Sequence, residues 1–389
     1  MIERKIRKRN SKTSNATSEG TETTSGVSNR PKENALTQQR LPALKPNLGS
    51  KTVLPILFGV GILFIPTGVV ILLDAMNVKE ISIPYTNCLK VNDPFNKTCK
   101  DEILHQNVSD RNCVCRLSFS IDEDWEGTVF MYYELKNFYQ NHRRYYDSKN
   151  EDQLLGNLRN YSSDDYDDEA KCDPFYKNEE TQKVYFPCGS IANSMFSDVI
   201  TLDYEAVVDV RQEVPLTRTG IAWASDKKHK FKNPEGVNDA AELEKKMENF
   251  SKPMHWKLNL WELDETNMDN NGLQNEDLIV WMRVAALPNF RKLYRKINHS
   301  SNYMFKNGLP KGNYFLRIEY NFEVSSFKGE KNIVLTTQSI LGGRNLFLGI
   351  AYIVTGGICT LFGLVFFFVY CKWGDSIEKG SKVMTELSK

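Results

Sequence analysis

The uncharged stretch VLPILFGVGILFIPTGVVILL, from Val53 to Leu73, decides the fold class of this chain. A second uncharged stretch runs from Leu346 to Cys371 and is bounded by Arg344 and Lys372. A bilayer core about 30 Å thick needs about 20 helical residues, so each stretch is long enough to span a membrane once. The sequence therefore predicts two transmembrane helices, at residues 53–73 and 346–371.

The charges beside these stretches predict their orientation. The first 51 residues carry eleven Lys or Arg and four Glu, and the C-terminal tail carries four lysines. Because basic flanks favour the cytosol, we expect cytosolic tails at residues 1–52 and 372–389 and a luminal or extracellular domain at residues 74–345. The polar segment from Asn10 to Asn34 predicts a largely disordered N-terminal tail. It also argues against a cleavable signal peptide.

Cysteines and glycosylation motifs support an exterior location for the middle segment. Six of the eight cysteines lie there, which suggests three disulfides, although six cysteines allow 15 pairings. The segment also contains five Asn-x-Ser/Thr motifs, which predict N-glycosylation. The asparagines of these motifs are Asn96, Asn107, Asn160, Asn249 and Asn298. A sixth motif, at Asn15, falls on the predicted cytosolic side and should stay unmodified.

Several segments of the middle domain alternate polar and apolar residues with the period of a β-strand. The segments are 115–121, 127–133, 314–324 and 332–340. We expect the last two to pair as a hairpin through the turn FKGEK at residues 327–331. Helices are predicted at residues 240–249 and 276–287. The predicted fold is a mainly antiparallel β ectodomain with a few helices, anchored by two transmembrane helices.

The sequence contains no group of residues with the spacing of a catalytic or cofactor-binding site. The five histidines are scattered without metal-ligand spacing, and there is no Gly-x-Ser-x-Gly or phosphate-loop motif. A net charge of +1 gives no global field that would favour nucleic acid. We therefore expect a protein that is not an enzyme, needs no cofactor or metal, and binds no nucleic acid.

Two polar segments allow a cation-binding hypothesis. Residues 267–272, NMDNNG, resemble the first half of an EF-hand loop, but Leu278 stands where a bidentate Glu is needed. An Asn-Gly turn leading into a helix explains the same residues, and we favour it. The acidic segment from Asp164 to Glu169 is similarly better explained as a solvated insertion.

Small residues recur along both apolar stretches. Gly349, Gly356 and Gly363 are spaced by seven residues, as are Gly61, Gly68 and Ala75. Lines of small residues let membrane helices approach closely. These two faces could pack the helices on each other, or one of them could contact a partner.

Several blocks of the chain resemble the Cdc-fifty/Lem-three family, the accessory β-subunits of type-IV P-type ATPases that flip phospholipids. They occur in the family's order from about residue 38 to 370. The blocks are QQRLPA (38–43), TVLPI (52–56), EGTVFMYYELKNFYQNHRRY (126–145), PCGSIANSMF (187–196), GIAW (220–223), NEDLIVWMRVAALPNFRKLYR (275–295) and GGRNLFLGIAYI (342–353).

The resemblance implies a sandwich-like ectodomain and a non-catalytic role. Such a subunit forms a heterodimer with the catalytic α-subunit, supports its exit from the endoplasmic reticulum and supports translocation of aminophospholipids to the cytoplasmic leaflet. The chain lacks the Asp-Lys-Thr-Gly motif of the pump itself. The implied locations are the endoplasmic reticulum, Golgi, secretory vesicles and plasma membrane. The alternative is a stand-alone membrane-anchored adhesion or receptor ectodomain, and a membrane-tethered enzyme ranks last.

The resemblance also implies particular site residues. The disulfides would be Cys88–Cys115, Cys99–Cys113 and Cys172–Cys188. Membrane phospholipids and the ATPase would be the binding partners. Candidate partner-binding residues are Gln38, Gln39, Arg40, Leu41 and Pro42 at the cytosolic side, Gly349, Gly356 and Gly363 in the membrane, and Arg143 and Arg144 in the ectodomain. For the two arginines, internal packing of their segment is an equally good explanation.

Overall fold

A computed structural model describes residues 34–36, 41, 49–104, 106–158, 170–207, 210–339 and 341–387. The chain divides into two compact units, Met1–Pro55 and Ile56–Lys389. The predicted disorder of residues 10–34 falls outside the described residues.

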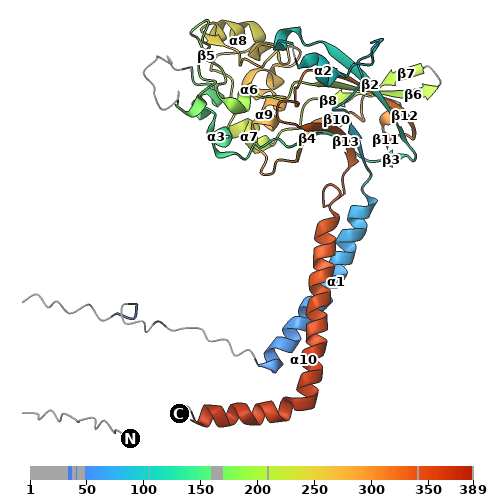
Figure 1. Cartoon of the computed structure of the whole chain (residues 1–389), viewed down its shortest axis with the longest axis vertical. Coiled ribbons are helices and arrows are strands. Elements are labelled where there is room, and N and C mark those ends of the chain that lie inside the picture. Colours follow the sequence, from blue (N-terminus) through green and yellow to red (C-terminus); the bar gives the residue numbers. More distant parts are fainter. Residues whose placement is uncertain are drawn as a thin grey trace, which may run out of the picture. The chain divides into compact units, whose positions relative to one another are not determined.

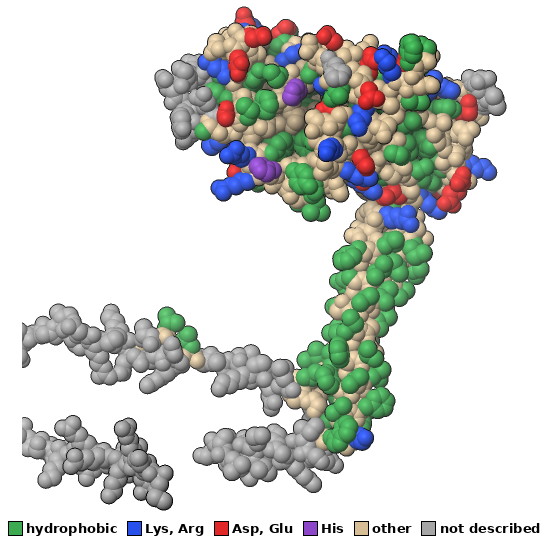
Figure 2. Space-filling view, in the orientation of Figure 1, with side chains coloured by type: hydrophobic (Ala, Val, Ile, Leu, Met, Phe, Trp, Pro, Cys, Tyr) green, Lys and Arg blue, Asp and Glu red, His purple; other side chains and the backbone are tan. Residues whose placement is uncertain are grey.

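The two apolar stretches form long helices, as predicted. The helix α1 (Ser50–Asn77) and the helix α10 (Leu346–Leu387) are the longest in the described chain. The parts of them long and apolar enough to cross a membrane are Thr52–Asn77 and Leu346–Gly374, slightly longer than predicted. Figure 2 shows a largely hydrophobic surface along both helices.

Between the long helices lies an ectodomain built on two antiparallel sheets, as predicted. The five-stranded sheet has the order β1-β13-β4-β10-β8, and the four-stranded sheet has the order β2-β12-β6-β7. The strands of the first are β1 (Glu80–Pro84), β13 (Glu330–Thr337), β4 (Val129–Lys136), β10 (Phe290–Ile297) and β8 (Leu216–Thr217). Those of the second are β2 (Cys113–Ile121), β12 (Gly312–Tyr320), β6 (Val199–Val207) and β7 (Val210–Glu213).

Short elements complete the ectodomain, and most of its short helices gather at one end, away from the β6–β7 pair (Figure 1). Two further pairs are β3 (Trp125–Glu126) with β11 (Gly308–Leu309), and β5 (Val184–Tyr185) with β9 (Phe250–Ser251). The α-helices are α2 (Cys99–Ile103), α3 (Arg143–Asp147), α4 (Glu151–Leu154), α6 (Ser190–Asn193), α7 (Ala224–His229), α8 (Ala240–Met247) and α9 (Glu276–Met282). The 3-10 helices are η1 (Val108–Asp110), η2 (Leu260–Glu262), η3 (Met268–Asn270), η4 (Gly272–Gln274) and η5 (Tyr303–Phe305).

Alternation along the strands places one face of each sheet in a shared core. In β12 the side chains of Tyr314, Leu316, Ile318 and Tyr320 are fully buried, while the residues between them are half-buried or exposed. Side chains from both sheets belong to one hydrophobic cluster. The two sheets therefore share a core, as in a sandwich-like arrangement. The period-two pattern therefore identified the buried face of β12 correctly.

The predicted hairpin between residues 314–324 and 332–340 is wrong. The strand β12 pairs with β2 and β6, whereas β13 pairs with β1 and β4 in the other sheet. The chain does turn near Gly329, whose N–H donates to the carbonyl of Val324. However, the N–H groups of Asn321 and Phe322 donate to the carboxylate of Asp198, so the β12 ladder ends and the chain crosses between sheets.

The helix predicted at residues 276–287 is also too long. It begins at Glu276, where Asn275 caps it, but ends at Met282. The ammonium of Lys292 accounts for this end, because it donates to the carbonyls of Val280, Trp281 and Arg283. The helix predicted at residues 240–249 is present as α8.

The long helices join neighbouring strands of one sheet. The helix α1 ends three residues before β1, and β13 ends nine residues before α10. At this point the N–H of Thr337 donates to the carbonyl of Lys79 over 2.9 Å, and the N–H of Lys79 donates to the hydroxyl of Thr337 over 3.0 Å. The pairing of β1 with β13 therefore holds together the two chain segments that lead to the membrane helices.

Candidate functional site

Gly349, Gly356 and Gly363 of α10 lie against α1 of the same chain. A Cβ built on Gly349 would lie 2.9 Å from Leu72 Cβ, and one on Gly356 would lie 2.8 Å from Ile65 Cγ1. A Cβ on Gly68 would lie 2.9 Å from the carbonyl oxygen of Gly349. These spaces are too small for a side chain, so the small residues let the two backbones approach closely. Contact of the same glycines with a partner stays a prediction.

Two other glycines of the helix pair face open space. Nothing lies within 4 Å of a Cβ built on Gly59 of α1 or on Gly357 of α10. Exposed phenylalanines, among them Phe347 and Phe368, also lie on α10. The helix pair therefore has an outer surface of both small and bulky apolar residues that its own packing does not use.

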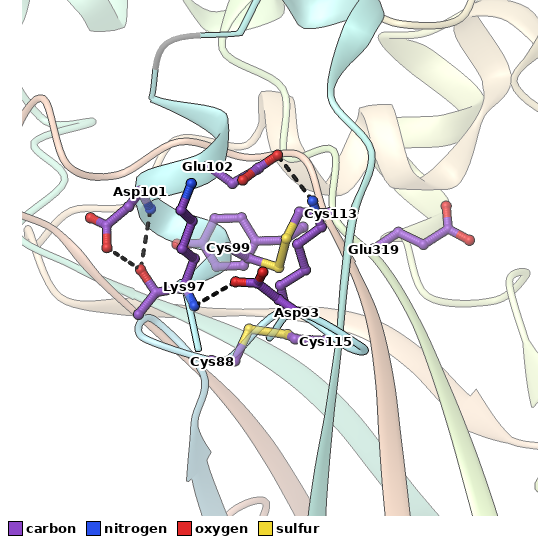
Figure 3. Close-up of a disulfide and its surroundings, with 12 residues drawn as sticks. Cys88, Asp93, Lys97, Cys99, Asp101, Glu102, Cys113, Cys115 and Glu319 are labelled. Atoms are coloured by element: carbon purple, nitrogen blue, oxygen red, sulfur yellow. Dashed lines mark hydrogen bonds and ion pairs between the residues drawn. A yellow bond between two sulfur atoms is a disulfide. The ribbon is translucent and has the colours of Figure 1, made fainter. Parts of the chain in front are cut away.

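Three disulfides stabilise the ectodomain, and they are the pairings that the family resemblance implied. The Cα atoms are 5.9 Å apart in Cys88–Cys115, 5.5 Å apart in Cys99–Cys113 and 5.7 Å apart in Cys172–Cys188. The first two bridges attach the start of β2 to the segment that contains α2 (Figure 3).

The cysteine cluster is structural rather than metal-binding. Cys88, Cys99 and Cys115 are the one group of metal-ligating residue types found close together in the described part of the chain, and all three are oxidised. A thiolate is needed to bind a metal, so these sulfur atoms are not available to an ion.

The block at residues 126–145 contributes β4 and a turn that packs into the core. The ring of Phe138 lies 5.2 Å from that of Phe327, 5.7 Å from that of Trp281 and 5.8 Å from that of Tyr145, measured between centroids. By contrast, Arg143 and Arg144 lie at the start of α3 and are exposed. Packing therefore explains Phe138 and Tyr145 but does not explain the two arginines.

Some of the other predicted site residues are not among the residues that the structure describes. Gln38, Gln39, Arg40, Pro42 and Asn160 are not among the described residues, whereas Leu41 is exposed. Of the remaining sequon asparagines, three are exposed and one is half-buried. The exposed residues are Asn96, Asn107 and Asn249, and the half-buried residue is Asn298.

The loop at residues 267–272 uses its side-chain oxygens for backbone capping. Asn267 Oδ1 accepts from the N–H of Asp269, and Asn271 Oδ1 accepts from the N–H groups of Asp264 and Gly272. Gly272 has φ +66°, and its missing Cβ would overlap the side chain of Asn233. The turn interpretation of this motif therefore accounts for its residues.

A cavity of about 730 Å³ opens between β6, β10, α9 and the loop at residues 255–266. Its walls include aromatic side chains at Tyr133, Phe196, Trp256 and Tyr294, together with aliphatic ones. Its volume lies within the range of about 300–1,000 Å³ that is typical of small-molecule sites. Sequence analysis missed this cavity because its walls come from segments far apart in the chain.

The ionisable side chains around the cavity include a three-residue ion-pair cluster. Arg295 holds both oxygens of Asp277, with Nη1–Oδ1 2.5 Å and Nη2–Oδ2 3.2 Å, and Arg218 Nη2 also lies 3.2 Å from Oδ2. Burial lowers the pKa of His255, also in the wall, so its ring is neutral near pH 7. These contacts stabilise the wall and do not resemble a nucleophile with its base.

Sequence analysis also missed a buried ion pair between the sheets. Lys331 Nζ lies 2.6 Å from Asp198 Oδ2, and both side chains are inaccessible to solvent. Burial lowers the pKa of Lys331 to about 8 despite the favourable charge of Asp198. A single lysine at the start of an apolar strand gives no sequence signal of this kind.

Comparison with known proteins identifies the family of this chain. A model described as the LEM3 (ligand-effect modulator 3) family / CDC50 family matches residues 71–376, which include the whole ectodomain and α10 up to residue 376. The chain belongs to the CDC50/LEM3 family. The sequence blocks that suggested this family therefore identified it correctly.

Curated relatives in the CDC50/LEM3 family match over most of their length. Cell cycle control protein 50A of Bos taurus is 44% identical over 350 residues, which cover 89% of this chain and 91% of the relative. Cell cycle control protein 50B of Homo sapiens is 38% identical, with 89% and 95% covered. ALA-interacting subunit 3 of Arabidopsis thaliana is 35% identical, with 88% and 87% covered.

Proposed function

We propose that this chain is a non-catalytic accessory subunit of a type-IV P-type ATPase that flips phospholipids. In this role it assembles with the catalytic α-subunit, supports exit of the complex from the endoplasmic reticulum and supports movement of aminophospholipids to the cytoplasmic leaflet. The observation that carries the proposal is membership of the CDC50/LEM3 family over residues 71–376. The name of one relative, ALA-interacting subunit 3, also describes a subunit that interacts with another protein.

The architecture suits such a role. The helix pair offers an outer apolar surface with two open glycines, through which it can contact other membrane helices. Three disulfides cross-link the ectodomain, so it can present a fixed surface to a partner's exterior loops. We assign the cytosolic contact to the segment from Gln38 to Pro42 and a luminal contact to Arg143 and Arg144.

The first experiment is a pull-down of the tagged chain in mild detergent, followed by mass spectrometry. We expect a near-stoichiometric type-IV P-type ATPase. Recovery of a monodisperse chain without any ATPase, under conditions that preserve known flippase complexes, would support a stand-alone adhesion or receptor role instead.

Variants of the chain test the proposed contacts. Arg143→Ala combined with Arg144→Ala should lower the yield of co-purified ATPase, and alanines at residues 38–42 should lower it further. The control is Lys245→Ala on α8, which removes an exposed cation elsewhere in the ectodomain. Unchanged yield with the double arginine variant rejects their role in partner binding.

We further propose that both termini are cytosolic and that the mature protein travels through the Golgi and secretory vesicles to the plasma membrane. Asn→Gln substitution at each of the six motifs, with gel mobility before and after glycosidase treatment, tests the orientation. We expect mobility shifts from the ectodomain motifs and none from Asn15. A shift from Asn15 would place the N-terminus in the lumen.

A further inference from the structure

Two loops carry exposed apolar side chains next to each other in the ectodomain. The loop between β4 and α3 runs along the loop between α9 and β10, and the N–H of Phe138 donates to the carbonyl of Pro288 over 3.0 Å. The side chain of Asn141 also donates to a carbonyl of the second loop. Tyr139 and Leu287 therefore lie close together, with 59% and 68% of their surfaces exposed.

Trp223, directly before α7, lies beside the same pair of loops. The guanidinium of Arg283, where α9 ends, lies 4.2 Å from the centroid of the Trp223 ring. The Trp223 side chain is still largely exposed. Figure 1 shows α3, α7 and α9 together at one end of the ectodomain. A large ring that a neighbouring cation holds in place loses little conformational entropy on binding, so it is suited to contact a partner.

The segments that carry these side chains have an excess of positive charge. Residues 137–147, 223–230 and 283–289 together contain six Lys or Arg and two Asp. Asp226 is shared by two of these cations. In the part of the chain that the structure describes, Arg144 has no ion-pair partner. The local field therefore attracts carboxylates.

Core packing does not account for the exposed aromatic and aliphatic side chains. Tyr139, Trp223 and Leu287 belong to three separate blocks that resemble the CDC50/LEM3 family, and other residues of each block pack in the core. Trp, Tyr and Arg are also the residue types that contribute most binding energy in protein interfaces. The exposed residues of these blocks therefore form a surface suited to a protein partner.

The position of this surface along the sheet favours a protein loop over a lipid surface. The start of β4 pairs with the end of β13, which leads to α10, whereas the exposed side chains follow the other end of β4. A partner's loop can extend along the ectodomain, but lipid headgroups stay at the bilayer.

We infer that Tyr139, Trp223 and Leu287, with Arg143 and Arg144 beside them, bind an exterior loop of a partner protein in which carboxylates flank an apolar side chain. We call these five residues the aromatic–arginine surface. The apolar side chain of the loop packs against the exposed rings, and its carboxylates pair with the arginines. The inference rests on the proposed function, because the loop belongs to the catalytic subunit.

Photo-cross-linking in cells tests this inference. The full tagged chain carries p-benzoylphenylalanine in place of Tyr139 or Leu287, and in place of the exposed Tyr303 of η5 as a control. After irradiation the chain is purified in mild detergent, and the cross-linked peptide is identified by mass spectrometry. We expect positions 139 and 287 to react with the same exterior loop of a P-type ATPase, close to an Asp or Glu, and position 303 not to react with it.

Variants separate the contributions of charge and shape, with cross-linking from position 139 measured relative to co-purified ATPase. Arg143→Glu combined with Arg144→Glu should reduce it about tenfold. Arg143→Lys combined with Arg144→Lys keeps the positive charge and should reduce it less than about threefold. Trp223→Ala should reduce it several-fold. All three variants change exposed residues, so their unfolding temperatures should match that of the wild type.

The outcomes distinguish this inference from the proposed function. ATPase that co-purifies without a cross-link from positions 139 and 287 overturns the inference and leaves the subunit role intact. Cross-links to lipid alone, cross-links to a loop without carboxylates, or charge-reversed variants that react like the wild type also overturn the inference. If no ATPase co-purifies, the inference and the proposed function both fail.

Discussion

The ammonium of Lys331 and the carboxylate of Asp198 form an ion pair across the two sheets, with Nζ–Oδ2 2.6 Å. Lys331 belongs to β13 of the five-stranded sheet, and Asp198 directly precedes β6 of the four-stranded sheet. The same carboxylate accepts from the hydroxyl of Tyr85 and from the N–H groups of Asn321 and Phe322. One side chain thus fixes the point where the chain leaves one sheet for the other.

Lys331→Met should therefore destabilise the ectodomain strongly. It removes one member of a fully buried pair, and leaving the other charge without its partner typically costs about 3–5 kcal/mol. We expect a lower unfolding temperature of the purified chain by differential scanning fluorimetry. Lys331→Met combined with Asp198→Asn should recover part of the loss, because it removes the unpaired charge.

Lys311→Met serves as the control for this series, since Lys311 is exposed. A Lys331→Met protein as stable as this control would show that the ion pair contributes little to the stability of the fold.

Replacing Cys172 and Cys188 together with alanine should lower the stability of the ectodomain. The bridge closes a loop with a sequence separation of 16 residues, for which about 3 kcal/mol of stabilisation is expected from restriction of the unfolded chain. Urea unfolding of the purified chain should show a lower midpoint. Cys359→Ala, which alters a free cysteine of α10, should leave the midpoint unchanged.

Neighbouring glycines of α10 allow a matched test of the helix pair. Gly356→Leu should separate α10 from α1, because its Cβ alone would lie 2.8 Å from Ile65 Cγ1, whereas Gly357→Leu should be tolerated in open space. A Cβ built on Gly363 would lie 3.5 Å from the Cβ of Leu57, so cysteines at these two positions should form a disulfide that reports the pairing. The native Cys359 and Cys371 are replaced by alanine for this measurement.

We expect Gly356→Leu to reduce this cross-link several-fold and Gly357→Leu to preserve it. If Gly357→Leu preserves the cross-link but lowers ATPase yield, the open face of α10 is a partner contact. Equal cross-linking in both variants would contradict the packing described above.

Glu276 should make stability depend on pH in the acid range. Its carboxylate accepts from the N–H groups of Ile221 and Ala222 and pairs with Lys227 over 2.8 Å. Burial raises the pKa of Glu276, but these hydrogen bonds and the charge of Lys227 outweigh burial and hold it below its ordinary value. The stabilisation is therefore present above the pKa of an unfolded Glu, about 4.3, and is lost as the pH falls through the lower folded pKa.

Glu276→Gln should accordingly cost about 1.5–3 kcal/mol near pH 7 and progressively less toward pH 3. Unfolding temperatures measured between pH 3 and 7 check this, with Glu244→Gln as the control. A difference from wild type that stays constant over this range would exclude the proposed role of ionisation.

Features that depend on a local sequence pattern could be predicted without the structure. An uncharged run of 21 residues predicts a membrane helix because each backbone polar group must be satisfied within the segment. The alternation around Tyr314 likewise predicts a strand with one buried face, since successive side chains point to opposite sides. The family was predicted from residue blocks that resemble it in the same order. The three disulfide pairings were predicted from that resemblance and not from periodicity.

Contacts between distant segments became visible in the three-dimensional fold alone. Sequence proximity suggested that β12 and β13 pair, but the carboxylate of Asp198, more than a hundred residues away, ends the β12 ladder. The ammonium of Lys292 ends α9 in the same way, and the cavity has walls from several separate elements. Hydrogen bonds and ion pairs of this kind depend on the distance between atoms in the folded chain. The order of residues in the sequence therefore does not predict them.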